Sequence, residues 1–133
     1  MVNSRTKGHS YEREIVNLLR EELGTIVDEP IKRILDQYRE NCLPDIVVGP
    51  LAIECQRYSQ GCVPHRAWWD QVVAAGKAND LIPALVYRFD RAKTLCVVPL
   101  YAINPDLPRS TESRATMDWN DFVMVMRENL ASP

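Results

Sequence analysis

Three segments of the chain repeat their hydrophobic residues every three to four positions, the spacing that gathers them on one face of a helix. The first begins near Ser10, a candidate N-cap, and stops before Gly24, which favours a helix C-terminus. The second begins at Pro64, and the third follows a cap at Thr116 or Asp118. We therefore expect three helices, the last of which closes the hydrophobic core.

Short apolar runs between these helices predict β-strands. Two of them flank the turn signal Gly49-Pro50 and are typical of a β-hairpin, and two more lie on either side of a turn that begins at Phe89. Residues 36–43 are polar and predict a loop that leads into the hairpin. The expected strands cover residues 25–29, 31–35, 46–48, 51–53, 82–88 and 93–100.

The composition is that of one ordinary globular domain. The 133 residues, 46% of them hydrophobic and 26% charged, suffice for a single core spanning residues 1–133. Residues 1–8 are expected to be flexible, and residues 102–133 to form an irregular connector followed by the last helix. No apolar run approaches the ~18 residues of a membrane span. The N-terminal residues do not resemble a secretory signal, so we expect a cytoplasmic protein without a membrane segment.

Charge and cysteine content narrow the classes of function. The net charge of −2 argues against a wholly basic nucleic-acid-binding domain, although basic residues within 5–20 and 57–93 leave room for a local basic face. The four cysteines include no Cys-x-x-Cys pair and are accompanied by only two histidines, so we expect reduced thiols and no zinc site. Cys55 lies between two polar residues of a strand and should face the core.

The hairpin carries the most informative charged residues. Asp45 precedes its first strand and Glu54 ends the apolar part of its second strand, so antiparallel pairing brings the two carboxylates to the same end. Carboxylates held close together raise a pKa unless a cation neutralises them, and their oxygens suit a divalent ion such as Mg²⁺. These two residues alone leave open an alternative, a strand-edge Asp45 and a solvated Glu54.

Two motifs together resemble the PD-(D/E)XK nuclease superfamily. Asp45, followed after eight residues by Glu54-Cys55-Gln56, is similar to the active-site hairpin of that superfamily. The segment from Lys7-Gly8 to Glu12 resembles the first-helix motif of archaeal Holliday-junction resolvases and related phage nucleases. The resemblance spans residues 7–98. It implies a restriction-endonuclease-like α/β core, in which helices flank a central mixed β-sheet, with an additional C-terminal helix.

The same resemblance implies a metal-dependent nuclease site that binds one or two Mg²⁺ or Mn²⁺ ions. Gln56 occupies the position at which the family has a lysine, and its amide donates a hydrogen bond but carries no charge, which puts the rate of cleavage in question. Arg57, the next residue on the strand, points to the opposite face and is a poor replacement. The expected catalytic residues are Glu12, Asp45, Glu54 and Gln56. The expected metal ligands are Glu12, Asp45, Glu54 and the main-chain carbonyl of Cys55.

The implied partner is DNA, and by analogy with the resolvases it is branched DNA bound by a homodimer. Two alternatives stay open. The chain could be a nuclease fold that binds DNA or a protein without cutting, or a small interaction domain whose acidic hairpin is coincidental. Gln71 is included among the DNA contacts because a glutamine follows the hairpin in related nucleases. The candidate DNA contacts are Lys7, Arg13, Arg33, Arg39, Arg57 and Gln71.

Overall fold

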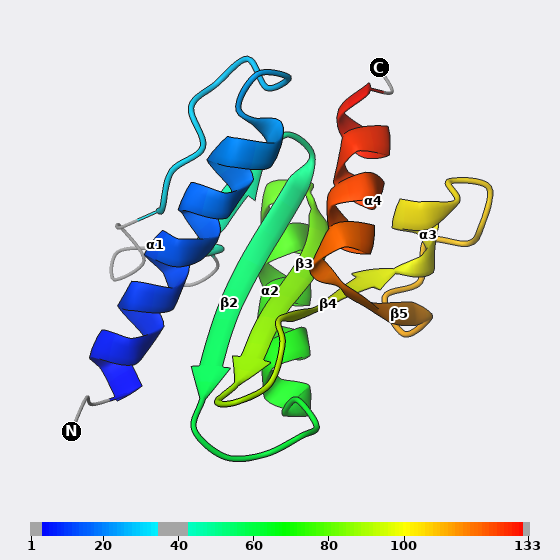
Figure 1. Ribbon diagram of the computed structural model, residues 1–133. Helices are drawn as coiled ribbons and strands as arrows, with labels where there is room; N and C mark the ends of the chain where they lie inside the picture. The colour runs from blue at the N-terminus through cyan, green and yellow to red at the C-terminus, as the bar shows by residue number, and fades with distance from the viewer. Residues whose placement is uncertain (1–3, 35–42, 132–133) are drawn as a thin grey trace.

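A computed structural model describes residues 4–34 and 43–131, with side chains described from residue 9 onward. Helices and strands alternate along this part of the chain (Figure 1). Their bounds are α1 (Ser4–Leu23), β1 (Ile46–Val48), β2 (Leu51–Tyr58), α2 (Arg66–Asn79), β3 (Ile82–Phe89), β4 (Leu95–Pro99), α3 (Leu100–Ile103), β5 (Arg114–Asp118) and α4 (Trp119–Ala131).

The strands form one five-stranded sheet in the order β1-β2-β3-β4-β5. β2 and β3 run parallel, whereas the other neighbouring strands run antiparallel. α2 supplies the crossover that a parallel pair requires. The sheet is therefore mixed, as the restriction-endonuclease-like fold predicts.

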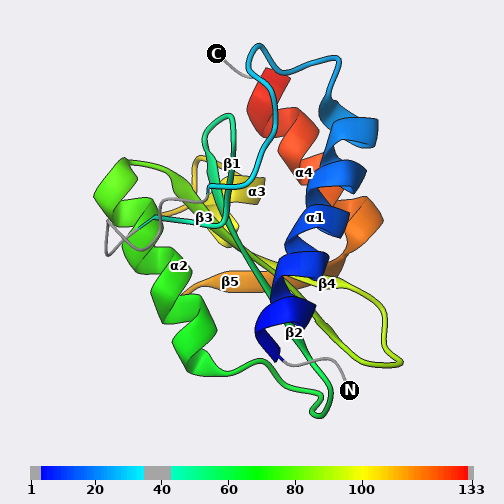
Figure 2. The same ribbon diagram turned by 90° about the vertical axis from the view of Figure 1, so that its left-hand side faces the viewer.

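Helices cover both faces of the sheet, with α1 and α4 on one face and α2 on the other (Figure 2). Alternation along β2 sends Ile53 and Cys55 into the core beneath α1 and α4, as expected for Cys55. On the opposite face, Trp68 and Trp69 of α2 pack against side chains of β3 and β4. Glu54 lies between two core residues of β2 and so faces α2. Within the described part of the chain, no helix is both long enough and apolar enough to cross a bilayer.

The first helix begins earlier than expected and ends where expected. α1 starts at Ser4, so residues 4–8, which we expected to precede the helix, form its first turns. The apolar stripe begins only at Tyr11, so hydrophobic spacing does not mark these turns. At the other end, the Gly24 N–H donates to the Arg20 carbonyl at 3.0 Å, and a Cβ on Gly24 would crowd the same oxygen.

The expected hairpin and later helices are confirmed. β1 and β2 pair around Gly49-Pro50, and Gly49 has a φ of +53°. A Cβ on Gly49 would overlap Leu130 Cδ2, so the hairpin turn lies directly against α4. α4 begins after Asp118, whose Oδ1 accepts a hydrogen bond from the Asp121 N–H at 2.9 Å. Its residues Phe122 and Met126 are fully buried, and the helix closes the core.

Three expectations for the weaker segments were wrong. Residues 25–29 form turns and bends rather than a strand, and among the described residues 31–34 of the next expected strand only Arg33 makes a β-bridge, to Ile46. The connector expected at 102–116 contains the end of α3 and the start of β5. β5 lies at the sheet edge and alternates exposed and half-buried residues, so it lacks the apolar run that marks a central strand. The loop predicted at 36–43 lies outside the described residues except for Leu43.

Candidate active site

Asp45 and Glu54 face each other across the hairpin. Ile46 pairs with Ile53, so the next position outward places Asp45 opposite Glu54, as the turn predicted. Both side chains are buried, with exposed fractions of 6% and 3%. Asp45 Oδ2 accepts a hydrogen bond from the Cys55 N–H at 2.8 Å, and the Asp45 carbonyl accepts one from Ile34 at 2.8 Å. These contacts fix the Asp45 carboxylate against β2.

Only one carboxylate oxygen of Glu54 has a hydrogen-bond partner among the described residues. Its Oε1 accepts a hydrogen bond from Gln71 Nε2 of α2 at 2.8 Å, while its buried Oε2 has no hydrogen-bond partner within the described residues. Burial first, and then the negative charges of Asp45 and Glu12, raise the pKa of Glu54 from 4.5 to about 9. A proton or a cation is therefore needed to stabilise this carboxyl group in the folded protein.

Glu12 borders this pair from α1. It is 9% exposed, and its Oε1 lies 3.4 Å from Arg33 Nε. Burial and the charge of Asp45 raise the pKa of Glu12 to about 7, while Arg33 acts in the opposite direction. Glu12 thus lies within electrostatic range of Asp45 but pairs with Arg33.

The donor set fits a divalent cation at Asp45 and Glu54. Within residues 4–34 and 43–131, no three carboxylate, thiol or imidazole groups are arranged as a ready-made metal site, so Glu12 does not complete one with the hairpin pair. Two adjoining buried carboxylates, one with an unpartnered oxygen, still supply the oxygen ligands that Mg²⁺ and Mn²⁺ prefer. The Cys55 side chain faces the core beneath α1 and α4, so Cys55 offers the site its main-chain carbonyl and not its thiol.

Gln56 lies on the same face of β2 as Glu54, two residues further along the strand, and is half-buried. Its neighbour Arg57 faces the other side and pairs with Asp90, with Nε and Oδ1 3.2 Å apart. Arg57 is therefore no substitute for the missing lysine, in agreement with the strand alternation.

Arg13 and Arg33 meet at a recess beside Glu12. The recess has a volume of about 240 Å³ and is lined by Arg13, Val16, Asn17, Arg20 and Arg33. Sequence reasoning named Arg13 and Arg33 as candidate DNA contacts but missed Arg20. The spacing of seven residues, two helical turns, places Arg13 and Arg20 on one face of α1 and was a signal that could have found it. Arg20 also donates from Nε to the Ile31 carbonyl at 2.8 Å, which holds the segment that carries Arg33.

The other candidate DNA contacts among the described side chains do not line this recess. Gln71 reaches the site itself through Glu54, whereas Arg57 pairs with Asp90 and does not line the arginine recess. Lys7 belongs to α1, but its side chain lies outside the described atoms, and Arg39 lies outside the described residues.

The mixed sheet with helices on both of its faces is compatible with the restriction-endonuclease-like α/β fold, and the paired buried carboxylates lie on its hairpin. The sequence model of the family described as "Phage putative PDDEXK endonuclease" matches residues 3–128. The chain belongs to this family.

Among solved structures, the chain is similar to Hjc, a Holliday junction resolvase from the archaeal hyperthermophile Archaeoglobus fulgidus. The two share 20% sequence identity and a TM-score of 0.49, covering 89% of this chain and 88% of the other. A comparison with curated proteins gave no match.

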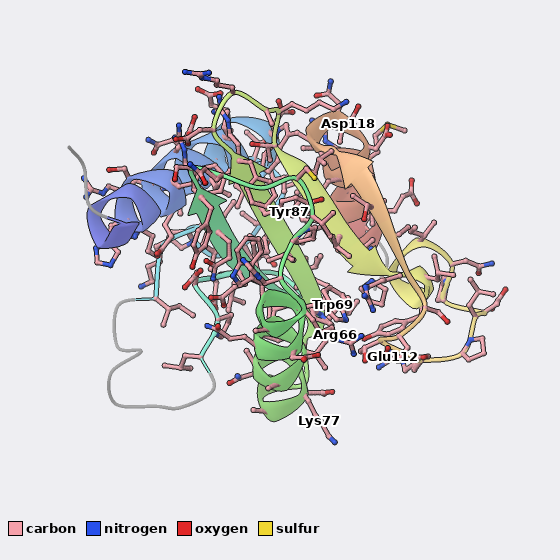
Figure 3. The ribbon with its side chains drawn as sticks, turned by 90° about the horizontal axis from the view of Figure 1, so that it is seen from below. Arg66, Trp69, Lys77, Tyr87, Glu112 and Asp118 are labelled. Atoms are coloured by element: carbon pink, nitrogen blue, oxygen red, sulfur yellow. The ribbon has the colours of Figure 1, made fainter. Side chains whose placement is uncertain are left out.

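The Arg33–Glu12 ion pair should stabilise the folded protein. Both side chains are largely buried, at 17% and 11% exposed, so Arg33→Gln leaves a buried carboxylate without its charged partner. We expect the free energy of unfolding to fall by about 1–3 kcal/mol in urea titrations. Arg66→Gln is the matched control, because Arg66 pairs at the surface with Asp70 and with Glu112, the second of which is labelled beside it in Figure 3. Its effect should stay within ~1 kcal/mol. If both variants lose the same free energy of unfolding, burial does not make the Arg33–Glu12 pair more stabilising than a surface pair.

Proposed function

We propose that this nuclease is a metal-dependent endonuclease that hydrolyses phosphodiester bonds in branched DNA and acts as a homodimer. The observation that carries the proposal is the buried pair of Asp45 and Glu54, in which Glu54 Oε2 has no hydrogen-bond partner within the described residues, so that a bound cation would satisfy it. The branched substrate and the homodimer rest on the resemblance of the segment from Lys7 to Glu12 to the resolvase motif. A two-fold dimer matches the symmetry of a four-way junction.

Asp45, Glu54 and the carbonyl of Cys55 would hold the ion, with Glu12 at the border of the site. When bound, Mg²⁺ or Mn²⁺ supplies an activated water and positive charge for the leaving oxygen. Gln71 orients Glu54 by its hydrogen bond to Oε1. Gln56, on the same face of β2, donates a hydrogen bond to the attacking water or to a phosphate oxygen.

The arginine recess supports binding of the DNA backbone. Guanidinium groups recognise phosphate oxygens through paired N–H donors, and Arg13, Arg20 and Arg33 line a hollow next to Glu12. Such contacts position a strand without reading its bases, so binding should weaken steeply as salt rises. This local basic face is compatible with the overall charge of −2, to which the buried acids of the site contribute.

A cleavage assay tests the proposal. We expect four-way junction DNA to be cut faster than nicked, single-stranded or linear duplex DNA, with cleavage in Mn²⁺ or Mg²⁺ and none in EDTA. Sedimentation should give the mass of two chains. Cleavage that persists in EDTA would contradict the metal dependence, and equal rates on all DNAs would contradict the branched preference. Tight junction binding without cleavage in any metal would favour the non-catalytic alternative, in which Gln56 marks lost activity.

A further inference from the structure

Aromatic rings gather where β2 ends and α2 begins. The Tyr58 ring stacks on Trp68, with centroids 4.9 Å apart and planes at 25°. His65 meets Trp68 edge-on at 4.9 Å and Tyr58 at 6.0 Å. Trp68 is buried, whereas Tyr58 is 42% exposed and His65 is exposed. We call Tyr58, His65 and Trp68 the aromatic platform, since a buried ring supports two rings that reach the surface.

The platform is held in place from beneath. Trp68 packs against Tyr87 and Phe89 of β3, with ring centroids 6.4 and 6.0 Å away. Tyr58 pairs with Phe89 in the parallel register, and its carbonyl accepts a hydrogen bond from the Asp90 N–H at 2.9 Å. An exposed ring that is already fixed loses little conformational entropy when it binds a flat ligand.

The platform lies on the same face of β2 as the active site. Glu54, Gln56 and Tyr58 alternate along one side of the strand, and α2 contacts both ends of this row, through Gln71 at Glu54 and Trp68 at Tyr58. Four residues of strand separate Tyr58 from Glu54, which is about 13 Å. A nucleic acid strand whose phosphate lies at Glu54 would therefore bring a base only a few nucleotides away over the platform.

Positive charge borders the platform. The turn after β3 is joined to Tyr58 by the Asp90 hydrogen bond and carries the exposed residues Arg91 and Lys93. Asp90, the acidic residue of this turn, is paired with Arg57 at 3.2 Å. Both parallel strands end here, at the end of the sheet where the loop leads into α2 (Figure 1). An exposed aromatic ring next to basic side chains matches nucleobases on a phosphate backbone.

We infer that the aromatic platform binds an unpaired nucleobase of the DNA substrate by stacking on Tyr58, with the tilted His65 ring beside the base. The inference deepens the proposed function, on which it rests for the identity of the ligand as DNA. In duplex DNA the faces of the bases are covered by their neighbours, whereas branched or frayed DNA offers free ones. The platform therefore favours DNA with unpaired bases over continuous duplex, independently of base sequence.

Fluorescence anisotropy in EDTA tests the inference with the full chain, using a labelled oligothymidylate and a labelled duplex. Tyr58→Ala should weaken oligothymidylate binding about 5- to 100-fold and duplex binding less than about twofold. Tyr58→Phe keeps the ring and should bind like the unmodified protein. His65→Ala, at an exposed position outside the core, should show the same selective loss and covers the case in which Tyr58→Ala unfolds. Val63→Ala is the matched control, since Val63 is 73% exposed in the same loop but has no ring.

The outcomes separate this inference from the proposed function. Failure of the unmodified protein to bind oligothymidylate would overturn the platform, as would equal losses on both DNAs or no loss in either ring variant. Because binding is measured without metal, selective stacking can be found in a protein that cuts nothing, in which case only the catalytic proposal fails. Normal junction cleavage combined with unselective ring variants would remove the platform and leave the nuclease proposal intact.

Discussion

Asp45→Asn and Glu54→Gln should each lower DNA cleavage by about a thousandfold. Each variant removes one carboxylate of the buried pair, and a bound ion supplies several kcal/mol of transition-state stabilisation that neither amide can retain. The measurement is single-turnover cleavage of junction DNA in Mn²⁺. Glu22→Gln is the matched control, because Glu22 is an exposed carboxylate that pairs with Arg127 and not with a residue of the buried pair. Retention of full activity in either site variant would remove the hairpin carboxylates from the mechanism.

In the absence of metal, Glu54→Gln should change how the stability of the folded protein depends on pH. Glu54 keeps its proton in the folded protein up to about pH 9 but loses it near 4.5 when unfolded. The stability that its protonated form contributes is therefore lost as the pH rises from about 4.5 to about 9, and Glu54→Gln should remove that part of the slope. Mn²⁺ must displace this proton, so its stabilising effect on the melting temperature should grow toward pH 9. A metal effect independent of pH, or unchanged in Glu54→Gln, would place the ion elsewhere.

Gln56→Lys should raise the rate of cleavage by about 10- to 100-fold. Position 56 lies on the face of Glu54, and an ammonium there would offset the charge that builds on the scissile phosphate, an effect that the neutral amide supplies only weakly. The lysine would also stabilise the ionised form of Glu54 and so favour metal binding at neutral pH. The rate constant for bound junction DNA at saturating Mn²⁺ separates these two contributions, since metal occupancy is then constant.

Gln56→Met is the companion variant, similar in volume and without a hydrogen-bond donor. If Gln56 orients water or phosphate, this variant should be slower than the unmodified protein. A Gln56→Lys enzyme that is unchanged or slower would show that charge at position 56 does not limit the reaction. Arg57→Gln is expected to leave the chemical step unchanged, because Arg57 faces away from Glu54 and pairs with Asp90.

The parts of the fold that sequence predicted are those encoded by local signals. Gly49-Pro50 determines the hairpin register, so the juxtaposition of Asp45 and Glu54 follows from the ten consecutive residues 45–54. The Gly24 stop and the Asp118 cap likewise act within one helical turn. β5 escaped prediction because an edge strand needs only one buried face and receives its pairing from β4.

The contacts that surround the carboxylates depend on tertiary structure and could not be obtained in the same way. Arg33 reaches Glu12 from 21 residues away, and Gln71 reaches Glu54 from 17 residues away. Their partners are decided by how α1 and α2 lie on the sheet. The family resemblance placed Glu12 and Gln71 near the site, but not the arginine that neutralises Glu12. The aromatic platform has the same origin, since only the parallel β2–β3 pairing brings Tyr58 beside the turn after β3.

The contact between Gly49 and Leu130 links the tip of the hairpin to the final helix. The tip of the hairpin has no room for a side chain because a leucine from the final helix occupies that space. A smaller residue at position 130 would open space at the tip, whereas a side chain at position 49 would displace Leu130 and would also be strained by the φ of +53°. Substitutions at these two positions, far apart in the sequence, should therefore be coupled, because the packing of the final helix limits what the tip of the hairpin can accept.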